Sequence, residues 1–243
     1  MGANALYLVL FDIDGTLIAT GGAGMRAFNR ALQDVFNIDG AHSEFRPDGK
    51  TDPMIARELL SHFGLEDQWC DRVREGLFSA YLHYLENEMQ RAKDQGLIRI
   101  LPGVLDLLEK LDGRSDFCQG LVTGNLQEGA RIKLEKASLD RYFRFGGYGS
   151  DAEDRTVLIR MAIERGIKAI SPTHAQGIYV FGDTPLDIIH GHAAGAKVIG
   201  IASGRYTLSD LGLHNPDLLL PDMVSNAEII DFMKRGAEPH GRV

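Results

Sequence analysis

Short apolar runs alternate with amphipathic helical patterns over most of this chain. Each run ends in small or polar residues, as buried strands do: LYLVLF, FCQGLVTGN, YFRFGGYGS, GIYVFGDTP, KVIGIASG and, as a possible sixth, LLLPD. The helical patterns between them are GVLDLLEKL, EGARIKLEKASL, DRTVLIRMAIERG and LDIIHGHAAGA. Buried strands that alternate with helices predict a parallel sheet covered on both faces, so the expected fold class is a doubly wound, Rossmann-like α/β core.

The stretch from residue 17 to residue 95 breaks this alternation. It has no convincing strand pattern, but helical patterns in GGAGMRAFNRALQDVF, DPMIARELLSHFG and QWCDRVREGLFSAYLHYLENEMQRA. We therefore expect an all-helical cap domain, residues 17–95, inserted into a core domain formed by residues 1–16 and 96–243. Phe78, Tyr81 and Tyr84 have helical spacing and should pack the core of this cap.

Composition narrows the class of partner. The chain has 243 residues, with 26 Lys and Arg against 34 Asp and Glu, and no basic cluster, which argues against nucleic acid and anionic membranes as partners and favours a small molecule. The two cysteines, Cys70 and Cys118, are far apart and form no metal-binding motif. No apolar run approaches the ~20 residues of a membrane span, and the N-terminus lacks a signal-peptide pattern, so we expect a cytoplasmic protein.

Polar residues follow several of the predicted strands. Ligands of open parallel sheets bind at the carboxyl ends of the strands, so these residues should lie together. They are Asp12, Asp14, Gly15 and Thr16 after the first strand, Thr123 to Asn125 after the second, Ser150 to Arg155 after the third, and Gly182 to Pro185 with Asp187 after the fourth.

Some of these residues also have a purely structural interpretation. Asn125 with Glu128 resembles a capping box, and Thr184 followed by proline is a typical helix start, with Asp187 favourable to the helix dipole. Arg155 is different, because a cation in the first turn of a helix opposes the dipole and needs an anionic partner. Its neighbours Asp151, Glu153 and Asp154 could each supply that partner.

Asp12 and Asp14 are harder to explain structurally. Side chains two residues apart in a strand point to the same face, where two carboxylates would repel one another. A divalent cation held between them and Asp183 would relieve the repulsion, and carboxylate and carbonyl oxygens are typical ligands of Mg²⁺. The sequence therefore predicts a magnesium site at this edge of the sheet.

The order of these motifs resembles the haloacid dehalogenase superfamily of phosphohydrolases. DIDGT, LVTGN, a basic residue opening a later helix and GDTPLD match its four motifs, and the helical insertion resembles the C1 type of cap found in the phosphoglycolate phosphatase and β-phosphoglucomutase branch. The resemblance implies that Asp12 is the nucleophile that forms an aspartyl-phosphate and that Asp14 is the general acid and base.

The resemblance also implies a binding set. Thr123, Gly124 and Asn125 would hold the phosphate oxygens and Arg155 would neutralise the phosphoryl group. The ligands of Mg²⁺ would be Asp12, the backbone carbonyl of Asp14 and Asp183, with support from Asp187. The third-motif cation is more often lysine in this superfamily, but no lysine opens the matching helix here. Lys133 and Lys136 lie on the preceding helix, where we expect them on a solvated face.

The cap adds one candidate substrate contact. Lys50, in the turn before the second helical pattern of the cap, would face the active site, although an exposed lysine beside an ordinary helix cap explains the turn equally simply. We expect a Mg²⁺-dependent phosphatase for a small phosphate monoester, acting as a monomer or homodimer, and the sequence does not select the ester. A phosphomutase and a noncatalytic metabolite-binding module are the alternatives.

Overall fold

A six-stranded parallel sheet forms the centre of the protein. The computed structural model describes residues 6–38, 46–170 and 175–235. The strand order is β5-β4-β1-β6-β7-β8, and each neighbouring pair is parallel. The strands are β1 (Tyr7–Phe11), β4 (Phe117–Thr123), β5 (Gly146–Tyr148), β6 (Gly177–Gly182), β7 (Lys197–Ile201) and β8 (Leu218–Leu220). All six fall within the apolar runs of the sequence, so the predicted α/β fold is confirmed.

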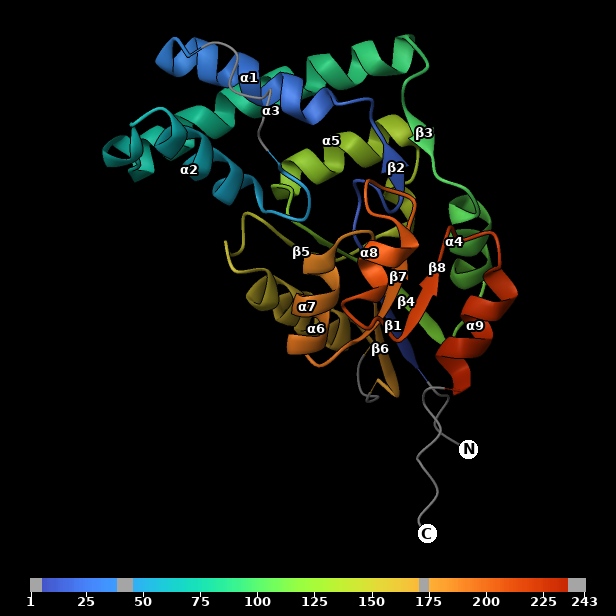
Figure 1. Ribbon diagram of the computed structural model, residues 1–243. Coiled ribbons are helices and arrows are strands. Elements are labelled where there is room, and N and C mark those ends of the chain that lie inside the picture. The colour runs from blue at the N-terminus through green and yellow to red at the C-terminus, as the bar shows by residue number, and fades with distance from the viewer. Residues whose placement is uncertain (1–5, 39–45, 171–174, 236–243) are drawn as a thin grey trace.

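Helices cover both faces of the sheet (Figure 1). On one face lie α4 (Val104–Asp112), α5 (Gln127–Ala137) and α9 (Asn226–Arg235), and on the other lie α6 (Arg155–Ile170), α7 (Pro185–Ala193) and α8 (Leu208–Gly212). A separate hydrophobic cluster fills each side. Because β1 is central and every residue in it is buried, its sequence is continuously apolar until Asp12.

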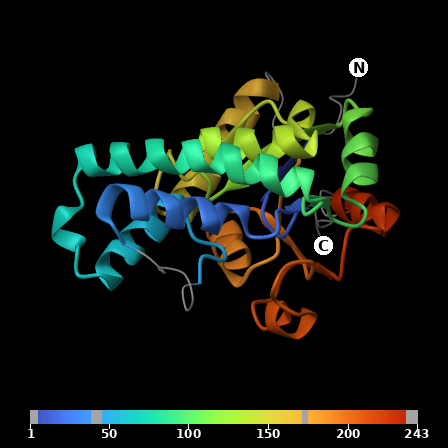
Figure 2. The same ribbon diagram turned by 90° about the horizontal axis from the view of Figure 1, so that it is seen from above.

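The helical insertion consists of α1 (Ala23–Phe36), α2 (Asp52–His62) and α3 (Asp71–Asp94). These helices lie above the carboxyl ends of the strands, and α1 and α3 run side by side (Figures 1 and 2). They share a hydrophobic cluster in which Tyr81 is buried and stacks on Phe28, with Phe78 and Tyr84 packed against it, as predicted. No helix within the described ranges has both the length and the apolar character to cross a membrane.

The insertion joins the core through a short antiparallel ribbon of β2 (Ile18–Ala19) and β3 (Arg99–Ile100). The expectation of no strand between residues 17 and 95 is therefore wrong at β2, because a two-residue strand is too short to leave a periodic pattern. Gly21, Gly22 and Gly96 next to the ribbon have positive φ angles of 59°, 82° and 65°, which glycine adopts without strain. We keep the division at residues 17–95 as a proposal.

Candidate active site

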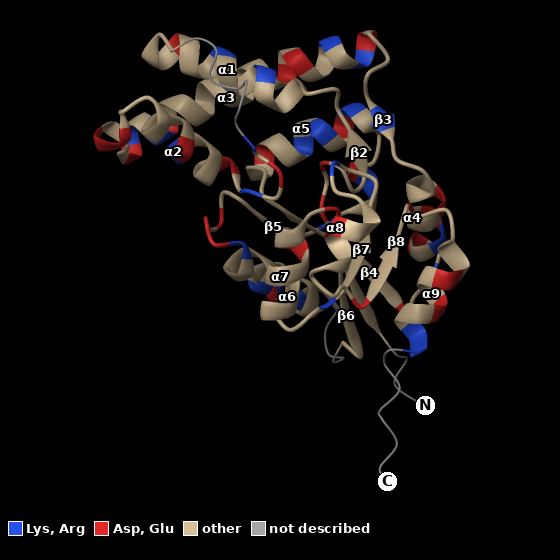
Figure 3. Ribbon diagram, in the orientation of Figure 1, with Lys and Arg blue, Asp and Glu red and all other residues tan. Residues whose placement is uncertain are grey.

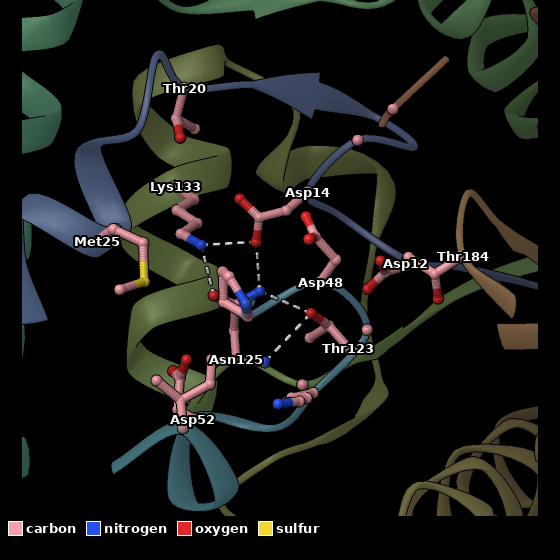
Figure 4. A pocket seen from close by; sticks show the side chains of 18 of the residues that line it. Asp12, Asp14, Thr20, Met25, Asp48, Asp52, Thr123, Asn125, Lys133 and Thr184 are labelled. Atoms are coloured by element: carbon pink, nitrogen blue, oxygen red, sulfur yellow. Dashed lines mark hydrogen bonds and ion pairs between the residues drawn. The ribbon is translucent and has the colours of Figure 1, made fainter. Parts of the chain in front are cut away.

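A cavity of about 320 Å³ lies between the carboxyl end of the sheet and the helical insertion. Core residues that line it include Asp12, Asp14, Thr123, Asn125 and Arg155, and the insertion contributes residues from the start of α1, from the turn before α2 and from α3. Residues that the sequence predicts to meet at this edge are therefore brought together, and Figure 4 labels Asp12, Asp14, Thr123, Asn125 and Thr184 among them. Figure 3 shows that acidic and basic residues are interspersed over the described elements.

Three buried acids meet beside β1. One carboxylate oxygen of each of Asp12, Asp183 and Asp187 lies within 4.8 Å of those of the other two. Burial raises the pKa of Asp12 to about 7, with Arg155 acting against this shift and the charges of Asp187 and Asp14 adding to it. The pKa of Asp183 is also raised well above its ordinary value, by burial and then by the charges of Asp187 and Asp12. The cluster is therefore short of positive charge.

The helix cap predicted at Thr184 is present. Thr184 is the N-cap of α7, its hydroxyl accepts a bond from the Asp187 amide, and the Asp187 carboxylate accepts a bond from the Thr184 amide at 3.0 Å. Asp187 also forms an ion pair with Arg155. Both oxygens of Asp187 are thus engaged by the protein, whereas Asp183 accepts a bond from Thr16 at 3.0 Å through Oδ1 alone.

Arg155 finds its anionic partners inside the site. It is buried at the start of α6, where Nη2 lies 3.5 Å from Asp12 Oδ1 and pairs with Asp187. The three sequence neighbours considered as partners are engaged elsewhere: Asp151 pairs with Arg165, Glu153 pairs with Arg57, and Asp154 accepts bonds from the amides of Thr156 and Val157. The Nε atom of Arg155 is buried without a hydrogen-bond partner among the described residues.

The position of Lys133 differs from the one predicted from sequence. Instead of lying on a solvated face, it is buried, and its ammonium donates to Asp14 Oδ2 and to Asn125 Oδ1, each at 2.6 Å. The physical reason is that Gly129, Ala130 and Ala137, which are buried, lie three or four residues away from Lys133, so Lys133 is on the buried side of α5, where its own side chain lines the cavity. That spacing was the available signal. Lys136 is not on a freely solvated face either, because it is half-buried and forms an ion pair with Glu86 on α3.

Asn125 does not form the predicted capping box. Its side-chain amide donates to Asp14 Oδ2 at 2.8 Å and to the Thr123 hydroxyl at 2.7 Å, and no side chain of the N-cap residue closes α5. Instead, Asp52 of the insertion accepts a hydrogen bond from the Leu126 amide at 2.8 Å. A residue distant in sequence thus caps the helix, which no local pattern could show.

The turn before α2 closes over the core. The Asp52 amide donates to the Gly124 carbonyl at 2.7 Å, and Arg155 donates to the Gly49 carbonyl at 3.1 Å. The approach is so close that a Cβ atom on Gly124 would lie 2.1 Å from the Lys50 carbonyl oxygen. Only glycine permits this contact, so Gly124 is needed for closure as well as for any backbone contact with a ligand.

Lys50 lies at the rim of the cavity. Its ammonium donates to Glu58 at 2.5 Å, and the next residue, Thr51, is the N-cap of α2. Both interpretations of this turn thus have a structural basis, and the substrate contact of Lys50 stays a prediction. Sequence reasoning gave Asp52 no role of its own and expected Lys133 on a solvated face, and it did not anticipate that Tyr81, buried in the cap cluster, also lines the cavity.

Comparisons with known proteins identify the class to which this α/β fold with its helical insertion belongs. The sequence profile described as "Haloacid dehalogenase-like hydrolase" matches residues 9–201. A phosphoglycolate phosphatase of Pseudomonas fluorescens is 24% identical over 89% of this chain and 76% of its own length, and the pyrophosphatase PpaX of Bacillus pumilus is 23% identical over 92% and 95%. A solved hydrolase structure from Pseudomonas syringae superposes with a TM-score of 0.68 at 23% identity, over 93% of this chain and 98% of the other.

The chain therefore belongs to the haloacid dehalogenase-like hydrolase family. It is a hydrolase of this family, and the relatives reported above are named a phosphatase and a pyrophosphatase. The resemblance inferred from the four motifs is thus confirmed.

Proposed function

We propose that the protein is a Mg²⁺-dependent phosphatase that hydrolyses a small phosphate monoester through an aspartyl-phosphate on Asp12. The observation that carries the proposal is the position of Asp12. It is buried at the end of β1, within one cavity with Asp14, with a guanidinium 3.5 Å away and Asp183 beside it. An anionic phosphoryl group and a cation can both approach its carboxylate there.

The acids present fit a magnesium ion. Two buried carboxylates with raised pKa values need a compensating charge, and they offer the oxygen ligands that Mg²⁺ takes. Asp12, Asp183 and the backbone carbonyl of Asp14 would hold the ion, while Asp187 would support the site through Arg155 and Thr184. A bound Mg²⁺ would neutralise charge on the phosphoryl oxygens.

Asp12 and Asp14, which follow β1, have different roles in the proposed reaction. An oxygen of Asp12 attacks phosphorus, the bond from phosphorus to the ester oxygen breaks, and Asp14 gives its proton to the departing alkoxide. Asp14 then takes a proton from the water that attacks phosphorus, which releases inorganic phosphate and restores Asp12. Because Lys133 and Asn125 both bond to Asp14 Oδ2, Oδ1 is the atom left to carry the proton.

Residues at the end of β4 and at the start of α6 would bind the phosphate group. The Thr123 oxygen accepts bonds from the Asn125 amide and side chain, so its own proton can be donated to a phosphate oxygen. The amides near Gly124 and the guanidinium of Arg155 complete the contacts, and a charged, planar donor suits a phosphoryl group. The buried, unpartnered Nε of Arg155 is consistent with an absent anionic ligand.

A cavity of about 320 Å³ suits a small substrate. The cap turn lies directly on Gly124 and covers the site at this point. The relatives' names suggest phosphoglycolate or pyrophosphate as the substrate. We keep a location in the cytoplasm and a monomeric or homodimeric state as predictions.

The test is phosphate release from a panel of small esters and pyrophosphate, with Mg²⁺ and with EDTA. We expect metal-dependent turnover that is lost in Asp12→Asn and kept in Asp106→Asn, a matched substitution at an exposed acid on α4. Turnover that persists in Asp12→Asn would refute the nucleophile. A phosphomutase would instead need a sugar bisphosphate activator, and a binding module would bind Mg²⁺ and ester without releasing phosphate.

A further inference from the structure

Two buried cationic side chains, Arg155 and Lys133, are among the described residues that line the cavity. Arg155, at the start of α6, contacts Asp12 and Asp187, which places it at the phosphoryl end. Lys133, on α5, contacts neither of these acids and bonds to Asp14 instead, on the side of the cavity that faces the helical insertion. Because Asp14 would protonate the leaving group, Lys133 lies beside the leaving group rather than beside phosphorus.

The two side chains of the ion pair between Lys133 and Asp14 differ strongly in their exposure to solvent. The side chain of Lys133 is 6% exposed, whereas that of Asp14 is 43% exposed and already accepts a bond from Asn125. Desolvation of an ammonium is costly, and a half-exposed carboxylate does not require such a partner. Asp14 alone is therefore a weak reason to bury a lysine here. The ammonium also stabilises the buried carboxylate of Asp52, because its charge lowers the pKa of Asp52 against the effect of burial.

A second donor faces the same space. Tyr81 of α3 is 1% exposed and lines the cavity, and its hydroxyl forms no hydrogen bond with any residue that the structure describes. Buried tyrosine hydroxyls usually have a partner. Burial and the nearby charges of Asp52 and Asp14 raise the pKa of Tyr81 well above its ordinary value, so the phenol keeps its proton and remains a donor.

Gly24 marks the point where these donors converge. A Cβ atom built on this residue would lie 3.6 Å from the Lys133 ammonium and 4.0 Å from the Tyr81 hydroxyl. Gly24 is in the first turn of α1, which has no acidic side chain and no side-chain cap, so the positive end of that helix adds to the same potential. An ammonium, a phenol and a helix start thus surround a space next to Asp14.

We propose that Lys133 and Tyr81, with the first turn of α1 around Gly24, form a subsite for an anionic group on the leaving group of the substrate. The substrate class is then a small phosphate ester or anhydride with negative charge at both ends, the second being a carboxylate or another phosphate. This inference rests on the proposed phosphatase function, because that function places the leaving group beside Asp14.

The test compares matched substrates. Phosphoglycolate and 2-hydroxyethyl phosphate differ chiefly in the charge of the leaving group, and pyrophosphate against methyl phosphate is the corresponding pair for a second phosphate. In Tyr81→Phe, which keeps the ring stacked on Phe28, and in Lys133→Met, we expect the ratio of kcat/KM values for the charged over the neutral member to fall about ten-fold or more. The pair that shows the fall identifies the second anion. Tyr84→Phe and Lys136→Met, on the same two helices, are the matched controls.

A ratio within two-fold of wild type in both variants, for both pairs, would overturn the subsite, even if phosphate release continued. If the wild type releases phosphate from none of the four compounds, the proposed function fails. The subsite is then tested by equilibrium binding of phosphoglycolate and of 2-hydroxyethyl phosphate to wild type and to Tyr81→Phe. Gly24→Ala gives an independent check, because its methyl group fits without a clash and still occupies the subsite. Gly24→Ala should lower kcat/KM for phosphoglycolate. An unchanged kcat/KM would contradict the placement of the subsite beside Gly24.

Discussion

The ammonium of Lys133 and the carboxylate of Asp14 are 2.6 Å apart, although one side chain is buried and the other is nearly half exposed. Asn125 donates to the same carboxylate oxygen at 2.8 Å. Two donors on one oxygen restrict the rotation of the carboxylate, and no described residue is shown to donate to its other oxygen. The residue proposed as acid and base is thus held in place before a substrate arrives, which is a condition for efficient proton transfer.

Asp14→Asn should lower kcat by about 10²–10⁴-fold with a smaller effect on KM, because asparagine keeps the shape but cannot exchange the proton. Steady-state kinetics with the best ester of the panel measure the effect. The exposed acid Asp106, changed to Asn, serves as the control. A kcat within a few-fold of wild type would exclude Asp14 from the proton transfers.

Asp52→Asn should change the pH dependence of stability. Burial raises the pKa of Asp52 to about 6, with Lys133 and the Leu126 amide acting against this shift. A carboxyl whose folded-state pKa lies above its unfolded value stabilises the fold below pH 4, and this contribution is lost as the pH rises to 6. Asparagine does not ionise and can still accept the bond from Leu126.

The free energy of unfolding of Asp52→Asn relative to wild type should therefore increase between pH 4 and pH 6, by up to about 3 kcal/mol, and stay level above pH 7. Urea denaturation at a series of pH values gives this difference. A difference independent of pH would show that Asp52 has an ordinary pKa in the folded protein.

Gly124→Ala should prevent closure of the cap turn. The added Cβ would lie 2.1 Å from the Lys50 carbonyl oxygen, so the turn or the end of β4 must move. We expect kcat/KM to fall by about 10²-fold, because displaced catalytic geometry is costly. Gly113→Ala is the control, since its Cβ would meet the Glu109 carbonyl at an ordinary 3.6 Å and its φ of −71° suits alanine. Equal activity in both variants would contradict a functional role for this contact.

Magnesium affinity should fall as the pH is lowered. The pKa of about 7 for Asp12 in the absence of metal means that protons compete with the ion for this carboxylate. We expect the apparent affinity, measured by calorimetry, to weaken at least about ten-fold from pH 8 to pH 6. Asp183→Asn should abolish most of the binding at both pH values. Affinity that is constant over this range would place the ion elsewhere.

The sequence was sufficient for the fold because each strand leaves an apolar run with polar residues at its end. Asp12, Asp14, Asp183 and Arg155 were predictable for the same reason, since strand ends and helix starts meet at one edge of a parallel sheet. Lys133 left only the spacing from Gly129, Ala130 and Ala137 as a signal, and that spacing does not show what its side chain meets, because its partners depend on how α5 lies beneath the helical insertion. Contacts between segments far apart in the chain, such as Asp52 with Leu126, leave no local pattern.

The most direct test of the central claim is to stop the reaction with acid during turnover of a ³²P-labelled ester and to locate the label by peptide mapping. The account predicts a covalent phosphate on Asp12 that hydroxylamine removes, and no label in Asp12→Asn. Continued release of phosphate without a labelled peptide, under conditions where a known aspartyl-phosphate is retained, would contradict the proposed mechanism.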